Sequence, residues 1–285
     1  MKPTDAFIQL SKYAEDLTKV YKAEKGKRAE LRAANLQLSQ YARDLTQTLE
    51  NLKGAHTELK SAYLDTIGRL VAAAEYKDED TGDHIVRMSR YSELMGKELG
   101  LSERDVEHLL YASPMHDIGK IGIPDSILWK NGKLSTEEFE VMKTHTTIGA
   151  RILAKSEAGV LRAGQQIAIT HHERWDGSGY PQGLSGEAIP LFGRIVGLVD
   201  VFDALSSRRP YKDPYPVEVA LSLIKKGRGT AFDPAIVDLF ISKFGGILDI
   251  REETGGEDLP TSQEFSWSER DVSDGTAAHS PKTNP

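Results

Sequence analysis

Residues 115–125 read MHDIGKIGIPD. The adjacent His116 and Asp117 can present an imidazole nitrogen and a carboxylate oxygen to one metal ion or to two neighbouring ions. Gly119 lets the chain leave a helix end sharply. An isolated His-Asp pair is most often a surface accident, so the significance of this pair depends on the segments around it.

Further segments on both sides carry histidines together with carboxylates, glycines or a lysine. They are DEDTGDH, which ends at His84, MKTH, which ends at His145, and HHERWDGSGYP, which begins with His171 and His172. With His116, these make five of the eight histidines of the chain. Histidine is rarely a preferred core residue, whereas neutral imidazole with carboxylate oxygen is typical of catalytic transition-metal centres. The pattern therefore predicts a metalloenzyme.

The geometry of a helix predicts more than one metal ion. Adjacent residues on a helix point about 100° apart, so we expect His171 and His172 to serve two neighbouring ions. The segment VDVFDAL places Asp200 and Asp203 on one helical face among apolar neighbours, where a charge needs a partner such as a cation. We predict that Asp200 is a metal ligand and that Asp203 orients a ligand or a water molecule. A helix cap or a surface ion pair is the alternative for Asp203.

Composition narrows the class of protein. The chain has 285 residues, a formal net charge of −7 and no cysteine, which excludes disulfides, thiolate metal sites and cysteine nucleophiles. The acidic balance argues against a surface that coats nucleic-acid polymers, although a small phosphorylated substrate remains compatible. The N-terminus lacks the apolar core of a signal peptide, and no window approaches the roughly 20 apolar residues of a membrane span. We expect a cytoplasmic protein.

Residues 64–248 are predicted to form one nearly all-α domain. Apolar residues recur at helical spacing between short polar loops, and alternating strand patterns are scarce. The turn signals are Asn131-Gly132, Gly177-Ser178-Gly179 and the glycines at 183 and 186. The expected helices are His84–Leu99, Arg104–Ala112, Glu137–Leu153, Phe192–Ser206 and Val217–Lys226.

Residues 1–63 are predicted to form a coiled coil. One heptad position carries leucine almost throughout, at Leu10, Leu17, Leu31, Leu38, Leu45, Leu52 and Leu59. A seven-residue apolar repeat of this length favours a parallel homodimer over a helix packed along its own domain. The region is one helix, or two helices with a break near Gly26. Residues 249–285 are polar and acidic, and we expect a disordered tail.

At this point three segments resemble a known family. HDIGKIGIPD, HHERWDGSGYPQGL and SSRRPYKD are similar to the HD-GYP family, a branch of the HD-domain metallophosphohydrolases known as cyclic di-GMP phosphodiesterases. The resemblance covers about Ala62 to Phe244 and implies an all-α HD-domain bundle. It also implies hydrolysis of cyclic di-GMP to linear pGpG, and onward to GMP, with iron or manganese. The metal ligands implied by the resemblance are His84, His116, Asp117, His145, His171, His172 and Asp200.

One position departs from the family pattern. Trinuclear members place a glutamate four residues before the first histidine, whereas this chain has Asp80, which is one methylene shorter. We therefore expect a binuclear resting site, with Asp80 as the candidate ligand of a third ion that its short side chain disfavours. The nucleophile would be a water held between two metals about 3.5 to 4 Å apart.

The resemblance also implies roles around the substrate. It places Lys120 near the substrate phosphate, and Arg209 and Lys212 in a phosphate clamp suited to guanidinium chemistry. Trp175 and Tyr180 belong to the GYP loop, whose aromatic rings could stack on guanine or contact a protein; in the family this loop is implicated in contacts with diguanylate cyclases. Two alternatives stay open. One is a cyclic dinucleotide sensor or partner-binding module with little turnover, and the other is an HD hydrolase that acts on another cyclic dinucleotide.

Overall fold

The computed structural model describes residues 3–75, 77, 82–130, 132–207 and 214–254. Within these ranges the chain is helical, with one isolated bridge between Arg228 and Phe232 and no strand. The predicted all-α class is confirmed. The α-helices are α1 (Pro3–Glu75), α2 (Gly82–Glu98), α3 (Glu103–Ala112), α4 (Asp125–Leu128), α5 (Thr136–Lys143), α6 (His145–Ile152), α7 (Gly159–Thr170), α8 (Leu191–Ser206), α9 (Val217–Lys226), α10 (Pro234–Ser242) and α11 (Phe244–Glu253). The 3-10 helices are η1 (Ser113–Met115), η2 (Ile118–Gly122) and η3 (Gly186–Ala188).

The chain divides into two compact units, residues 1–62 and 63–285. The first unit is a continuous helix that passes through Gly26 without a break. A glycine costs only about 1 kcal/mol relative to alanine in a helix, which the strong helix formers around it offset. Every side chain from Phe7 to Leu59 is exposed, including the leucines of the heptad seam. The predicted dimer therefore stays a prediction.

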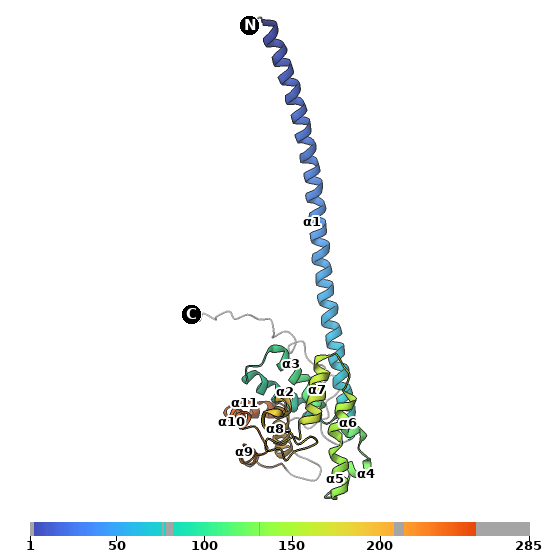
Figure 1. Cartoon of the computed structure of the whole chain (residues 1–285), viewed down its shortest axis with the longest axis vertical. Coiled ribbons are helices and arrows are strands. Elements are labelled where there is room, and N and C mark those ends of the chain that lie inside the picture. The colour runs from blue at the N-terminus through green and yellow to red at the C-terminus, as the bar shows by residue number, and fades with distance from the viewer. Residues whose placement is uncertain (1–2, 76, 78–81, 131, 208–213, 255–285) are drawn as a thin grey trace. The chain divides into compact units, whose positions relative to one another are not determined.

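The core of the second unit is built around α8 (Figure 1), which packs against α2, α7, α9 and α10. Helix α8 is buried on most of its circumference because its sequence, LFGRIVGLVDVFDALS, is apolar nearly all round. The ring of Phe202 lies in this core. Its centroid is 5.1 Å from the ring centroid of Phe240 and 6.0 Å from that of Tyr91. The last turns of α1 join this core through Leu64, Ile67, Val71 and Ala74.

Two boundaries differ from the sequence prediction. The expected helix from Glu137 to Leu153 is two helices, α5 and α6, that meet at Thr144, whose hydroxyl donates to the carbonyl of Val141. This hydroxyl competes with the helical hydrogen-bond pattern. The expected boundary after 248 falls inside α11, which continues to Glu253 because Ile247 is buried and Ile250 packs against the core. Residues 255–285 lie outside the described residues.

Candidate metal centre

Seven side chains from distant parts of the sequence meet in two neighbouring groups. The first group contains Asp117, His145, His171 and His172, and the second contains His84, His116 and Asp200. Within each group the potential ligand atoms all lie within 4.8 Å of one another. They come from the start of α2, the junction of η1 and η2, the start of α6, the end of α7 and the middle of α8. The structure thus brings together all seven residues that the sequence proposed as ligands.

Three of the histidines are held in the same way, by a carbonyl three residues earlier in the chain. Each imidazole Nδ1 donates to that carbonyl oxygen: His116 to Ser113 at 2.9 Å, His145 to Met142 at 2.7 Å and His171 to Ala168 at 3.1 Å. These carbonyls belong to η1 and to the last turns of α5 and α7, each just before its histidine. Because a carbonyl only accepts, the proton is on Nδ1, and the lone pair of Nε2 remains for a metal.

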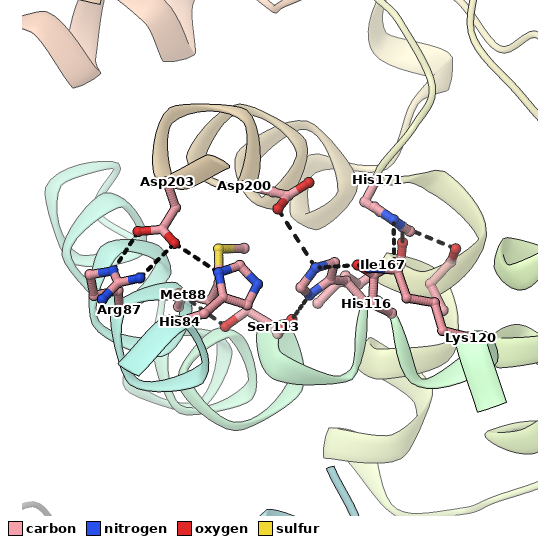
Figure 2. A network of polar contacts seen from close by, with 12 residues as sticks. His84, Arg87, Met88, Ser113, His116, Lys120, Ile167, His171, Asp200 and Asp203 are labelled. Carbon is pink, nitrogen blue, oxygen red and sulfur yellow. Dashed lines mark hydrogen bonds and ion pairs between the residues drawn. The ribbon is translucent and has the colours of Figure 1, made fainter. Parts of the chain in front are cut away.

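His84 is held by a buried ion pair instead of a carbonyl (Figure 2). Its Nδ1 donates to Oδ2 of Asp203 at 2.8 Å, and Arg87 donates to both oxygens of Asp203, at 2.6 and 3.0 Å. Asp203 is 1% exposed, so the alternative of a surface ion pair is excluded. Burial raises the pKa of Asp203, but the hydrogen bonds from His84 and Arg87 outweigh burial and bring the pKa below its ordinary value. Asp203 thus stays ionised behind His84.

Asp117 lies between the two groups. One carboxylate oxygen, Oδ2, is 2.7 Å from Nζ of Lys120 and 3.2 Å from Nε2 of His116. The other, Oδ1, is 3.2 Å from Nε2 of His145 and 3.6 Å from Nε2 of His171, yet it is buried and makes no hydrogen bond to the described residues. Burial raises the pKa of Asp117, and Lys120 and His116 more than offset that effect, so the pKa lies well below its usual range. An ionised, buried oxygen facing imidazole nitrogens fits a bound cation.

The motif glycine at 119 is explained by contact instead of by a sharp turn. Its φ is not positive, and a Cβ placed on it would lie 1.9 Å from the backbone oxygen of His145. Only glycine therefore lets η2 approach the start of α6. This close approach brings Asp117 to His145.

The structure allows His171 and His172 to serve the same ion, whereas the sequence predicted different ions. Their ring centroids lie 4.0 Å apart and their ligand atoms belong to one group. Helix α7 ends at Thr170, and the two histidines occupy the turn that follows it. Burial lowers the pKa of both His145, to about 4, and His172. Both imidazoles are therefore neutral near pH 7, the form that binds metals.

Comparison with known proteins identifies the domain. A family model described as HD domain matches residues 70–236. The chain belongs to the HD-domain family. Curated relatives of this HD domain include a cyclic di-GMP phosphodiesterase of Thermotoga maritima, 49% identical over 65% of this chain and 50% of its own length. The cyclic di-GMP phosphodiesterase response regulator RpfG of Xanthomonas campestris is 49% identical over 62% of this chain and 47% of its own.

Other relatives carry a different substrate in their names. The 3'3'-cGAMP-specific phosphodiesterase 2 of Vibrio cholerae is 41% identical over 64% of this chain and 35% of its own length. The solved structure of a cyclic GMP-AMP specific phosphodiesterase from V. cholerae shares the fold, with a TM-score of 0.51, 24% identity and coverage of 70% of this chain and 54% of that one. The chain spans about half the length, or less, of these curated relatives.

A cavity of about 420 Å³ adjoins the metal groups of the HD domain. His171, His172, Trp175 and Tyr180 line it, together with side chains from α5, α8 and the segment before α10. The guanidinium carbon of Arg194 lies 5.8 Å from the ring centre of Trp175. A pocket of this size, with aromatic walls and a few charged groups, is suited to a small organic ligand.

Some residues that hold the site were not predicted from the sequence, and some predicted residues lie outside the described part of the chain. Arg87 was missed, although its position three residues after His84 on one helical face was a usable signal. Glu173 and Arg194 had no signal beyond their charge. Asp80, Arg209 and Lys212 lie outside the described residues. Among the described helices, none is both long enough and apolar enough to cross a membrane.

Proposed function

We propose that this HD domain hydrolyses cyclic di-GMP to linear pGpG, and that two divalent metal ions serve the reaction. The observation that carries the proposal is the Asp117 carboxylate, buried and ionised between two groups of imidazole nitrogens. The names of the relatives at 49% identity support the substrate. The signalling role of cyclic di-GMP would make the protein part of a signal transduction pathway.

The proposed roles follow from the donor set. His145, His171 and His172 would hold one ion, His84, His116 and Asp200 the other, and Asp117 would reach both. Bound there, two divalent ions lower the pKa of a water molecule and offset the charge of the phosphodiester. With nitrogen and oxygen ligands only, we propose iron or manganese, although the ligand chemistry alone also admits zinc, nickel or cobalt. A third ion at Asp80 is not part of the proposal.

The chain itself supplies charge and orientation. The ammonium of Lys120, 2.7 Å from Asp117 and 16% exposed, is proposed to donate to a phosphate oxygen or to the leaving oxygen. Arg209 and Lys212 are proposed to clamp the phosphates, because guanidinium binds two phosphate oxygens at once. We propose that the cavity beside His171 receives a guanine base against Trp175. Asp203 acts through His84 and not on the substrate.

Hydrolysis of defined nucleotides tests the proposal. Purified protein loaded with Mn²⁺ or Fe²⁺ is incubated with cyclic di-GMP, with 3'3'-cGAMP in parallel, and the products are separated by chromatography. We expect pGpG, and we expect Asp117→Asn to form none. Stoichiometric binding without a linear product would support the sensor instead. Faster cleavage of 3'3'-cGAMP would support a second candidate function, hydrolysis of another cyclic dinucleotide, which the name of the relative at 41% identity favours.

Assembly is proposed separately from catalysis. The exposed leucine seam of α1 is proposed to form a parallel homodimer, and the GYP loop is proposed as a contact for diguanylate cyclases. A cytoplasmic location stays a prediction.

A further inference from the structure

His172 is held differently from the other four histidines of the metal groups. His84, His116, His145 and His171 each engage Nδ1 in a hydrogen bond. Neither ring nitrogen of His172 makes a hydrogen bond to any residue that the structure describes. A metal ligand with a free imidazole ring can rotate about its side-chain bonds, so something else has to fix its orientation.

Aromatic rings take the place of that hydrogen bond. The ring of Tyr180 lies 4.8 Å from the His172 ring at an interplanar angle of 35°, and the ring of His171 lies 4.0 Å away at 40°. His145 meets His172 edge-on at 5.1 Å. Among the aromatic rings of the described residues that contact His172, Tyr180 is therefore the one that is not itself a candidate ligand. Its hydroxyl makes no hydrogen bond to the described residues, so the contact depends on the ring alone.

Tyr180 is in turn supported from the direction of α5. The ring of Phe139 meets Tyr180 edge-on at 6.2 Å, and Nζ of Lys143 lies 5.6 Å from its centre. Aromatic pairs and cation–π contacts of this kind are attractive. The tyrosine ring is thus packed between α5 and the ligand ring.

The loop from Glu173 to Leu184 is shaped to bring Tyr180 back onto His172. The backbone N–H of Tyr180 donates to the carbonyl of His172 at 3.2 Å. A Cβ on Gly179 would lie 2.6 Å from that same carbonyl oxygen, so only glycine permits the approach. The buried carboxylate of Glu173 closes the loop by accepting from the backbone N–H groups of Gln182, at 2.7 Å, and Leu184, at 3.0 Å.

We propose that Tyr180 is a positioning residue whose ring fixes the orientation of His172, and that the GYP loop holds the Tyr180 ring against His172. The inference rests on the proposed metal centre, but not on the identity of the substrate. It assigns the tyrosine a place behind a ligand, whereas the sequence had offered contact with guanine or with a protein. Phenylalanine should therefore replace it, whereas a branched aliphatic side chain should not.

Metal binding by three variants of the full chain tests the proposal. Tyr180→Phe keeps the ring, Tyr180→Leu removes it, and Trp175→Leu is the matched control, because Trp175 lies in the same loop but contacts Arg194 instead of a ligand. Bound Mn²⁺ is titrated for each protein, and melting is followed without metal. We expect Tyr180→Leu to weaken one of the two equivalents by about 10–100-fold, with the other equivalent unchanged. Tyr180→Phe and Trp175→Leu should bind both equivalents of Mn²⁺ with the affinity of the parent protein.

Three results would overturn the proposal. These are parent-like titration of Tyr180→Leu, equal losses in Tyr180→Phe and Tyr180→Leu, or an equal loss in Trp175→Leu. If Tyr180→Leu melts far below the parent protein without metal, Glu173→Gln is used instead, because it weakens the closure of the loop and keeps the ring. It should weaken the same equivalent, and parent-like binding would count against the proposal. A parent protein that binds two equivalents without cleaving cyclic di-GMP refutes the proposed function alone, whereas one that binds no metal refutes both.

Discussion

Two buried carboxylates in this domain differ in what surrounds them, and the difference separates a ligand from a support. Asp203 has both oxygens occupied by hydrogen bonds from Arg87 and His84. Asp117 has one buried oxygen that makes no hydrogen bond to the described residues, facing the Nε2 atoms of His145 and His171. A carboxylate with donors on both oxygens is already neutralised, whereas a buried carboxylate oxygen without a donor is open to a cation.

Replacing Asp203 by asparagine tests this distinction. Asp203→Asn leaves the guanidinium of Arg87 buried without its counter-charge, which should cost about 3–5 kcal/mol of the free energy of unfolding. Because His84 loses its ionised acceptor, we also expect metal affinity to fall about 10–100-fold. Urea denaturation and Mn²⁺ titration measure the two effects. The control is Asp238→Asn, which breaks an exposed pair with Arg228 and should change neither quantity appreciably. Unchanged metal affinity in Asp203→Asn would remove Asp203 from its role behind His84.

At the scale of elements, helix ends orient the histidines. His116, His145 and His171 each follow a helix closely enough for Nδ1 to reach a carbonyl of its last turn. Composition and motifs predicted these histidines. They did not predict the hydrogen bond from each Nδ1 to a carbonyl, because that bond depends on where the preceding helix ends. The break between α5 and α6 was missed, and with it the placement of His145. The shared group of His171 and His172 was missed, because an angle of about 100° between adjacent side chains does not by itself keep their ring nitrogens apart.

Contacts between residues far apart in the sequence could not be predicted either. Arg87 and Asp203 are 116 residues apart in sequence, and no local pattern pairs them. The all-α class, by contrast, follows from apolar periodicity within each segment, which is a local property. The ligand residues could be predicted from the sequence because a metal requires particular side chains. The residues that orient the ligands could not, because any donor or ring in a suitable position can do this.

Lys77 lies just after α1 and contacts residues that follow the candidate ligands His116 and Asp117 in the sequence. Its ammonium donates to the carbonyls of Ile121, at 3.0 Å, and Ile123, at 2.8 Å, and lies 3.1 Å from a carboxylate oxygen of Asp125. The indole of Trp129 donates to the carbonyl of Lys77 at 2.6 Å. These contacts hold Lys77 against the residues that follow Lys120.

Lys77→Met should release that connection. We expect a loss of about 1.5–3 kcal/mol in the free energy of unfolding, the range for hydrogen bonds to a charged group, and faster amide hydrogen exchange between residues 118 and 128. Lys97→Met is the control, because Lys97 forms an exposed pair with Glu93 within one helix. Equal exchange rates in the two variants would show that Lys77 does not hold the loop.

At the scale of the whole molecule, the candidate ligands span residues 84–200 and come from three α-helices, the η1–η2 junction and the turn after α7. A bound ion links these elements only in the folded state, so it should stabilise the domain by mass action, by about 2.7 kcal/mol when the free ion is at 100 times its Kd. We expect removal of metal with a chelator to lower the Tm, and added Mn²⁺ to restore it. Asp117→Asn should abolish the response, and a variant that still responds fully would argue for a metal site elsewhere.

The first unit of the molecule makes a prediction of its own about assembly. Leu31 and Leu38 occupy the heptad seam and are 63% and 66% exposed, whereas Leu36, 71% exposed, lies on the opposite face with Ala33. If the seam buries these leucines in a parallel dimer, lysine at both Leu31 and Leu38 should separate the subunits, because two like charges would meet across the interface. The same two substitutions at Ala33 and Leu36 should leave the dimer intact. Sedimentation equilibrium distinguishes the cases, and identical masses for the two double variants would exclude this seam as the interface. A monomer that retains full hydrolysis would further separate assembly from catalysis, since every candidate ligand belongs to the second unit.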